Sequence, residues 1–156
     1  MTRTLTPQTR RSSALAAFAE GFGTHAALPA DLVLRYGKAV ASVAAADGEL
    51  SEAEVACFCT TMRAWGATDL ELDECFGAPE PSGAPLEAAL RPLARLILYD
   101  AIRVAAADGF GPVERDAARR AAERLGLDPG LVPAIEGLLG VEEALRAARL
   151  RLLSPG

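Results

Sequence analysis

The sequence has few of the residues on which common catalytic and metal-binding motifs depend. His25 is its only histidine and lies between Gly23 and Pro29, where a solvated turn residue is expected. No Ser-His-Asp set, phosphate-binding glycine loop or H-E-x-x-H motif is found. The three cysteines include no C-x-x-C pair, so we expect reduced thiols rather than a zinc or redox site. The sequence therefore predicts a protein that is not an enzyme.

Positive charge and long apolar runs are also scarce. Lys38 is the only lysine and the formal net charge is −5, which disfavours binding to the phosphates of nucleic acid. No segment reaches the roughly 18 uninterrupted apolar residues of a transmembrane helix. Residues 1–11 are expected to form a flexible tail, because the apolar stretch after Arg10-Arg11 is too short for an export signal. We therefore expect a soluble protein that binds no nucleic acid.

What the sequence does have is the composition of a helical globule. Hydrophobic residues make up 51% and charged residues 24%, which provides enough apolar surface for a core. Alanine and leucine dominate over β-branched and aromatic residues, and this balance favours helix over strand. A length of 156 residues suits one domain. We predict a single all-α domain over residues 12–153.

Apolar residues at helical spacing, together with capping and breaking residues, predict a compact bundle of seven to eight helices. Ser51 and Glu54 form a capping box before one helix, and Asp128-Pro129 has the residues preferred at another helix start. The proline- and glycine-rich stretch over 77–85 is the expected linker. The expected helices cover about 12–22, 30–46, 52–65, 68–76, 86–107, 112–125, 128–139 and 141–153.

The chain contains one internal repeat. The segment Val43–Gly48 recurs letter for letter as Val104–Gly109, 61 positions later. Each copy ends a predicted helix, and a glutamate follows early in the next helix. This pattern predicts two pseudo-symmetric helix–loop–helix repeats, the first over 30–76 and the second over 86–139, followed by a C-terminal helix over 141–153.

Acidic residues end both copies of the repeat. Asp47 and Asp108 each lie one helical step beyond an apolar stripe, so both are predicted on the buried face. Carboxylates brought together by pseudo-twofold packing repel each other unless a proton, water or a cation intervenes. The alternative is that Asp-Gly only ends each helix, while Glu54 acts as a cap and Glu114 complements the helix dipole.

These motifs resemble the TerB-like family. The resemblance rests on a helix ending in A-x-x-A-A-A-D-G at Ala41–Gly48, a short loop, a glutamate in the next helix, and a second such unit closed by Leu125-Gly126-Leu127. It spans about residues 30–140. The family includes the tellurite-resistance protein TerB and N-terminal regions of some membrane-anchored J-domain co-chaperones. The resemblance implies an all-α fold of two pseudo-symmetric helical repeats.

The resemblance also implies a site and a role. By position it assigns a site for a divalent cation, calcium or magnesium, to Asp47, Glu54, Asp108 and Glu114. The spacing from aspartate to glutamate is seven residues in the first copy but six in the second, which departs from the family pattern at Glu114. The implied protein is a non-enzymatic stress-response adaptor that binds other proteins, some of them membrane-associated. It would act in the cytoplasm or peripherally at the inner membrane, as a monomer or a dimer.

Two other functions are compatible with the sequence. One is that of a purely structural protein-interaction domain without metal. The other is binding of a small hydrophobic ligand, which requires an enclosed apolar cavity of roughly a few hundred Å³. In the last helix, Arg146, Arg149 and Arg151 form either a solvated face or a patch for acidic lipid or a partner.

Overall fold

Helices make up the fold, as the composition predicted. The structure is a computed structural model that describes residues 28–46, 48–77 and 86–154. Within these ranges it contains six α-helices, one 3-10 helix and no β-strand. The α-helices are α2 (Ala30–Ala44), α3 (Glu52–Ala64), α4 (Asp69–Gly77), α5 (Ala94–Ala105), α6 (Pro112–Arg124) and α7 (Leu131–Leu153), and the 3-10 helix is Arg91–Leu93. The all-α prediction is confirmed.

Several sequence-based expectations, including those for His25 and Asp47, fall outside these ranges. The tail over 1–11, the helix over 12–22 and residues 78–85 of the linker all lie outside the described residues. None of the described helices combines the length and apolar character needed to cross a lipid bilayer.

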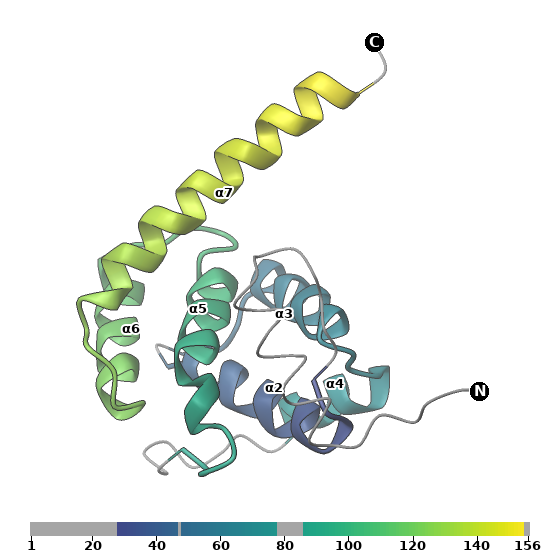
Figure 1. Cartoon of the computed structure of the whole chain (residues 1–156), viewed down its shortest axis with the longest axis vertical. Coiled ribbons are helices and arrows are strands. Elements are labelled where there is room, and N and C mark those ends of the chain that lie inside the picture. The colour runs from purple at the N-terminus through teal and green to yellow at the C-terminus, as the bar shows by residue number, and fades with distance from the viewer. Residues whose placement is uncertain (1–27, 47, 78–85, 155–156) are drawn as a thin grey trace.

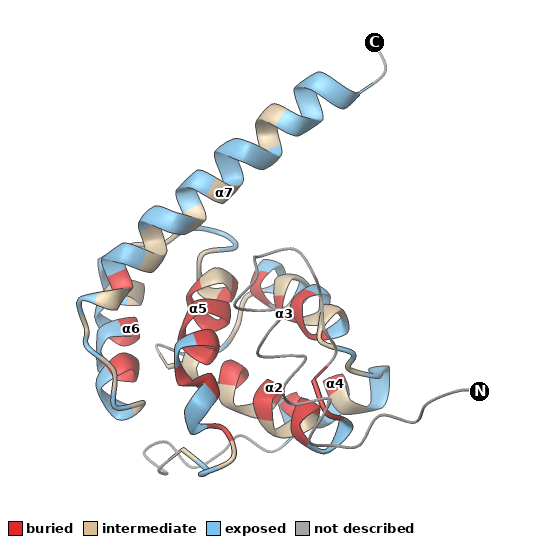
Figure 2. Ribbon diagram, in the orientation of Figure 1, coloured by how far each residue is buried: buried red, intermediate tan, exposed pale blue. Residues whose placement is uncertain are grey.

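Helix α5 lies at the centre of the fold. Its sequence is apolar on nearly all sides, a pattern typical of a buried helix, and Ile97, Leu98 and Ile102 are almost fully buried. One face of α5 packs with α2 and α3, whereas the other packs with α6 and α7, and α4 packs against α2 (Figure 1). Burial is concentrated on α5 and on the helix faces around it, while α7 is largely exposed (Figure 2).

The two repeats have the same order of helices, and the second helix of each repeat contacts the first helix of the other. In order, α2, α3 and α4 correspond to α5, α6 and α7, and α3 packs mainly against α5 of the other repeat. Helices α3 and α6 both end before a glycine with positive φ, Gly66 at 93° and Gly126 at 73°. The residue after each glycine donates its N–H to the carbonyl five residues earlier, at 3.0 and 2.8 Å. Glycine adopts this conformation without strain, so both repeats end their second helix in the same way.

One long helix replaces two that the sequence predicted. Helix α7 continues from Leu131 to Leu153, so the expected break at Gly140 is wrong. A glycine inside a helix costs only about 1 kcal/mol relative to alanine, and the surrounding leucine, alanine, glutamate and arginine residues favour helix. The ladder of backbone hydrogen bonds therefore continues through Gly140.

The helix expected over 86–107 is shorter than predicted. The 3-10 helix Arg91–Leu93 comes first, and regular α-helix begins only at Ala94. Pro92 lies in that 3-10 helix. Because proline has no N–H and its ring crowds the preceding turn, a regular α-helix rarely extends to the N-terminal side of it. At the other end α5 stops at Ala105, three residues before Asp108.

Thr61 of α3 provides a test of the core. Its hydroxyl is buried without a hydrogen-bond partner among the described residues, a situation that costs about 1–3 kcal/mol. We expect Thr61→Val to raise the free energy of unfolding by about 1 kcal/mol in urea denaturation. Thr60→Val is the matched control, because the exposed Thr60 hydroxyl donates to the Ala56 carbonyl at 2.9 Å. Equal stabilities for the two variants would contradict this account of Thr61.

Candidate functional site

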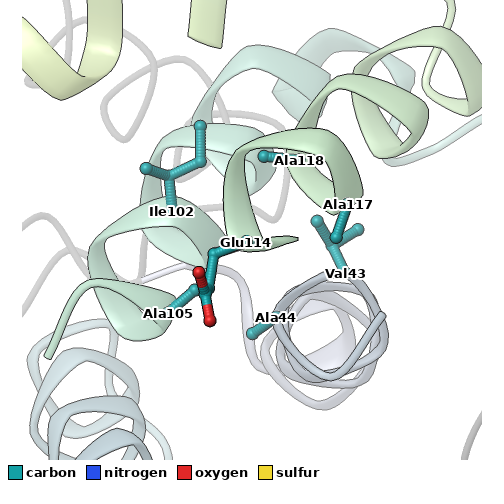
Figure 3. A pocket seen from close by; sticks show the side chains of 8 residues that line it. Val43, Ala44, Ile102, Ala105, Glu114, Ala117 and Ala118 are labelled. Carbon is teal, nitrogen blue, oxygen red and sulfur yellow. The ribbon is translucent and has the colours of Figure 1, made fainter. Parts of the chain in front are cut away.

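Glu114 lies where the two repeats meet. Its side chain comes from the first turn of α6 and reaches the space beside Ala44 and Ala105, the last residues of α2 and α5 (Figure 3). The hollow beside the carboxylate has a volume of about 10 Å³, room for about one water molecule. Helix C-termini carry partial negative charge and carbonyl groups without helical partners. The junction therefore combines a carboxylate with two helix ends that favour positive charge.

Glu114 also starts its own helix. Its Oε2 accepts a hydrogen bond from the Gly111 N–H at 2.8 Å. In the first repeat, Glu54 Oε2 accepts from the Ser51 N–H at 2.7 Å, and the Ser51 hydroxyl accepts from the Glu54 N–H at 3.3 Å. The two glutamates therefore occupy equivalent capping positions, three residues after the cap. The second loop is one residue shorter than the first, and the shortening lies between Asp108 and the cap residue Gly111. The spacing from the cap residue to Glu114 is therefore the same as in the first repeat.

The predicted four-carboxylate site is not assembled among the described residues. Asp108 is exposed in the loop after α5, so its predicted place on the buried face is wrong. The reason is that α5 ends at Ala105, and helical periodicity does not extend to Asp108. Asp47 lies outside the described residues. Within 28–46, 48–77 and 86–154, no three His, Cys, Asp or Glu side chains gather as metal ligands. The cation site stays a prediction.

A groove of about 890 Å³ lies between α3, the end of α5 and the middle of α7. Its surface is partly apolar, with several alanines and Phe110, and both signs of charge line it. The hydrophobic-ligand alternative predicted an enclosed apolar cavity, whereas this groove carries charged side chains. The charged residues that line it are Arg103, Glu136, Glu142, Glu143 and Arg146.

Two polar contacts hold the first half of α7 against the body. Arg115 of α6 donates from Nε to Glu136 Oε2 at 3.0 Å, and this hydrogen bonding holds the pKa of the Glu136 carboxyl below its usual value. Tyr99 of α5 donates its hydroxyl to Glu142 Oε2 at 2.5 Å. Burial and this hydrogen bond raise the pKa of Tyr99 well above 10. One wall of the groove is therefore fixed in place by ionic and hydrogen-bonded pairs.

A buried carboxylate that the sequence did not lead us to expect lies at the centre of the core. Asp100 of α5 is 2% exposed, and its Oδ2 accepts from the Tyr36 hydroxyl at 2.6 Å and from Trp65 Nε1 at 2.8 Å. Burial, together with Asp100, raises the pKa of Tyr36 well above 10. The signal was present in the sequence, because an aspartate flanked by the apolar residues of a helix requires hydrogen-bond donors when it is buried. Asp100 links three helices and serves the fold.

The complete chain is similar to a crystal structure of a tellurite resistance protein from Nostoc punctiforme PCC 73102. The match covers 100% of this chain and 98% of that chain, with a TM-score of 0.73 and 27% sequence identity. This chain has a TerB-like fold. The resemblance carried by the repeat motif and the Leu-Gly-Leu segment is therefore confirmed, and the similarity extends beyond residues 30–140. No family model and no curated protein matches the sequence.

Proposed function

We propose that this TerB-like protein is a non-enzymatic binding module of a tellurite-resistance-type stress response. The observation that carries the proposal is the similarity over the full length of both chains to a tellurite resistance protein. Three carboxylates in or near the core make hydrogen bonds that hold the fold, which supports a structural role for them over a catalytic one. Glu54 and Glu114 accept from backbone N–H groups, and Asp100 accepts from Tyr36 and Trp65.

The role itself is tested in cells. Deletion of the gene in its host is expected to lower the concentration of potassium tellurite that stops growth, and a plasmid copy is expected to restore it. Unchanged tellurite tolerance in the deletion strain would contradict the proposed stress role.

For a partner protein we propose the groove between α3 and α7. Alanines in its lining allow the backbone of a partner segment to approach closely, and the rim charges can pair with polar side chains. Ala107 is exposed in this groove, so Ala107→Trp is expected to fill it and to abolish complementation of the deletion strain. Ala134→Trp is the matched control, because Ala134 is exposed on α7 outside the groove. Full complementation by Ala107→Trp would rule out the groove as the partner surface.

We further propose that a divalent cation binds at the junction beside Glu114. Calcium and magnesium prefer oxygen ligands, which carboxylates and carbonyl groups supply. The support is the meeting of Glu114 with the C-terminal ends of α2 and α5, and the position of Asp47 and Asp108 in sequence just after those ends.

Thermal melting tests the cation directly. Millimolar calcium or magnesium is expected to raise Tm, because a ligand that binds only the folded state stabilises it in proportion to occupancy. Glu114→Gln is expected to remove the shift, since glutamine keeps an oxygen for the Gly111 N–H but loses the charge. Glu123→Gln on the exposed side of α6 is the control and is expected to keep the shift. If neither cation changes the Tm of the unaltered protein, the proposed cation site is wrong, whereas the proposed binding of a partner protein is unaffected.

A further inference from the structure

The second half of α7 is largely exposed within the described part of the chain, apart from the hydrogen bond between Glu142 and Tyr99. The helix starts against α5 and α6 and then extends away from the body, as Figure 1 shows. Val132, in the first turn, is its only buried residue. Nearly all positions from Val141 to Leu153 are exposed or only partly covered (Figure 2). Such a projecting helix presents its side chains to other molecules.

One side of this helix is apolar with the spacing of a coiled coil. Successive apolar residues are three, four, three and four positions apart, which is the a/d pattern of a heptad repeat. The four larger side chains are between 40% and 82% exposed. At 100° per residue the stripe points away from the Arg115 contact and from most of the groove, and Glu142, which contacts Tyr99, lies at its edge. The stripe consists of Leu138, Val141, Leu145, Ala148 and Leu152.

The charges beside the stripe change sign along the helix. Glu142 and Arg149 lie on the same flank, one on each side of the central Leu145. If a second copy runs antiparallel with its twofold axis at Leu145, Glu142 of each copy faces Arg149 of the other. In a parallel pair the same two residues would face Gly137 and Ala144, with no charge to meet.

We propose that two copies of this chain associate through α7, as an antiparallel helix pair centred on Leu145. The stripe is itself symmetric about this residue. Leu138 meets Leu152 of the second copy, and Val141 meets Ala148, so each large side chain opposes an apolar one. Oε2 of Glu142 accepts a hydrogen bond from the Tyr99 hydroxyl, and the carboxylate can accept further hydrogen bonds from Arg149 of the second copy. Apart from Glu142, the α7 residues of the groove lie on the other side of the helix, so the inference goes beyond the proposed function and leaves most of that surface open.

Sedimentation equilibrium of the full chain tests the pairing. The unaltered protein is expected to form a dimer that dissociates on dilution through the micromolar range, and Leu145→Glu is expected to weaken it at least about tenfold. Leu150→Glu is the matched control, because Leu150 is 61% exposed on the opposite side of the same helix. The control is expected to remain dimeric. A monomer at about 100 µM, or equal behaviour of the two variants, would overturn the proposal.

Disulfide trapping tests the orientation. When Leu138→Cys and Leu152→Cys proteins are mixed and oxidised, an antiparallel pair is expected to yield mainly the mixed 138–152 disulfide. A parallel pair yields 138–138 and 152–152 disulfides instead, and this result would overturn the antiparallel arrangement. A membrane is the other possible occupant of the stripe. Monomers that sediment with anionic vesicles and lose that binding in Leu145→Glu would overturn pairing between copies.

Discussion

Replacement of Asp100 with alanine is expected to lower the free energy of unfolding by about 3–5 kcal/mol. The change leaves the Tyr36 hydroxyl and the Trp65 indole N–H buried without the acceptor they share. An unsatisfied buried donor costs about 1–3 kcal/mol, and two are created at once. A loss of this size is a large part of the total stability of a typical domain. Trp65 is the only tryptophan, so its fluorescence during urea denaturation reports on this site directly.

Three variants show whether the loss comes from the shared acceptor. Asp100→Asn keeps an acceptor oxygen and is expected to cost less than alanine. Tyr36→Phe removes one donor and is expected to cost about 1–2 kcal/mol. Asp116→Ala is the surface control, because Asp116 is exposed and pairs with Arg119 within α6, and it is expected to cost less than about 0.5 kcal/mol. A similar cost for Asp100→Ala and Asp116→Ala would show that the buried carboxylate does not stabilise the core.

Gly37→Leu is expected to destabilise the protein by about 2–3 kcal/mol, because α2 has no space for a side chain at this position. A Cβ atom on Gly37 would lie 2.7 Å from Cys75 Sγ and 3.0 Å from the terminal methyl carbon of Met62. Leucine is a good helix former, so any loss comes from packing and not from helix propensity. Burial raises the pKa of Cys75 to about 11, so its thiol is uncharged at neutral pH and packs as a small apolar group.

The same substitution at Gly137 is the control for Gly37→Leu. Gly137 lies in α7, and nothing lies within 4 Å of the place its Cβ would take. Gly137→Leu is therefore expected to stabilise the protein slightly, because leucine has the higher helix propensity. Cys75→Ala is expected to recover part of the loss in Gly37→Leu by removing the nearest atom. Losses of equal size at Gly37 and Gly137 would contradict a packing origin.

Local signals in the sequence predicted local structure well. Ser51 and Glu54 identified the start of α3, and the structure has both hydrogen bonds of that capping box. The repeat at Val43–Gly48 predicted two equivalent units, and Glu54 and Glu114 cap their helices in the same way. These features depend on residues within a few positions of each other, which a single sequence displays directly.

Features that depend on packing between distant segments were harder to predict. The buried position predicted for Asp108 assumed that its helix continues by one more turn, whereas α5 ends at Ala105. Gly140 looked like a break because its helix propensity is low, although its neighbours outweigh it. Asp100 was overlooked because its two donors come from positions 64 and 35 residues away in sequence. Binding of a cation remains a prediction, because it depends on contacts between residues that are far apart in the sequence.

The packing of each repeat against helices of the other has a consequence for synthesis of the protein. The core of the first repeat includes side chains of α5, which belongs to the second repeat. As the chain leaves the ribosome, α2 and α3 therefore expose their apolar faces until residues beyond Ala105 have emerged. Neither half is expected to persist alone as a folded unit. A truncated product would be a substrate for chaperones and proteases, so the cell would contain the whole domain or none of it.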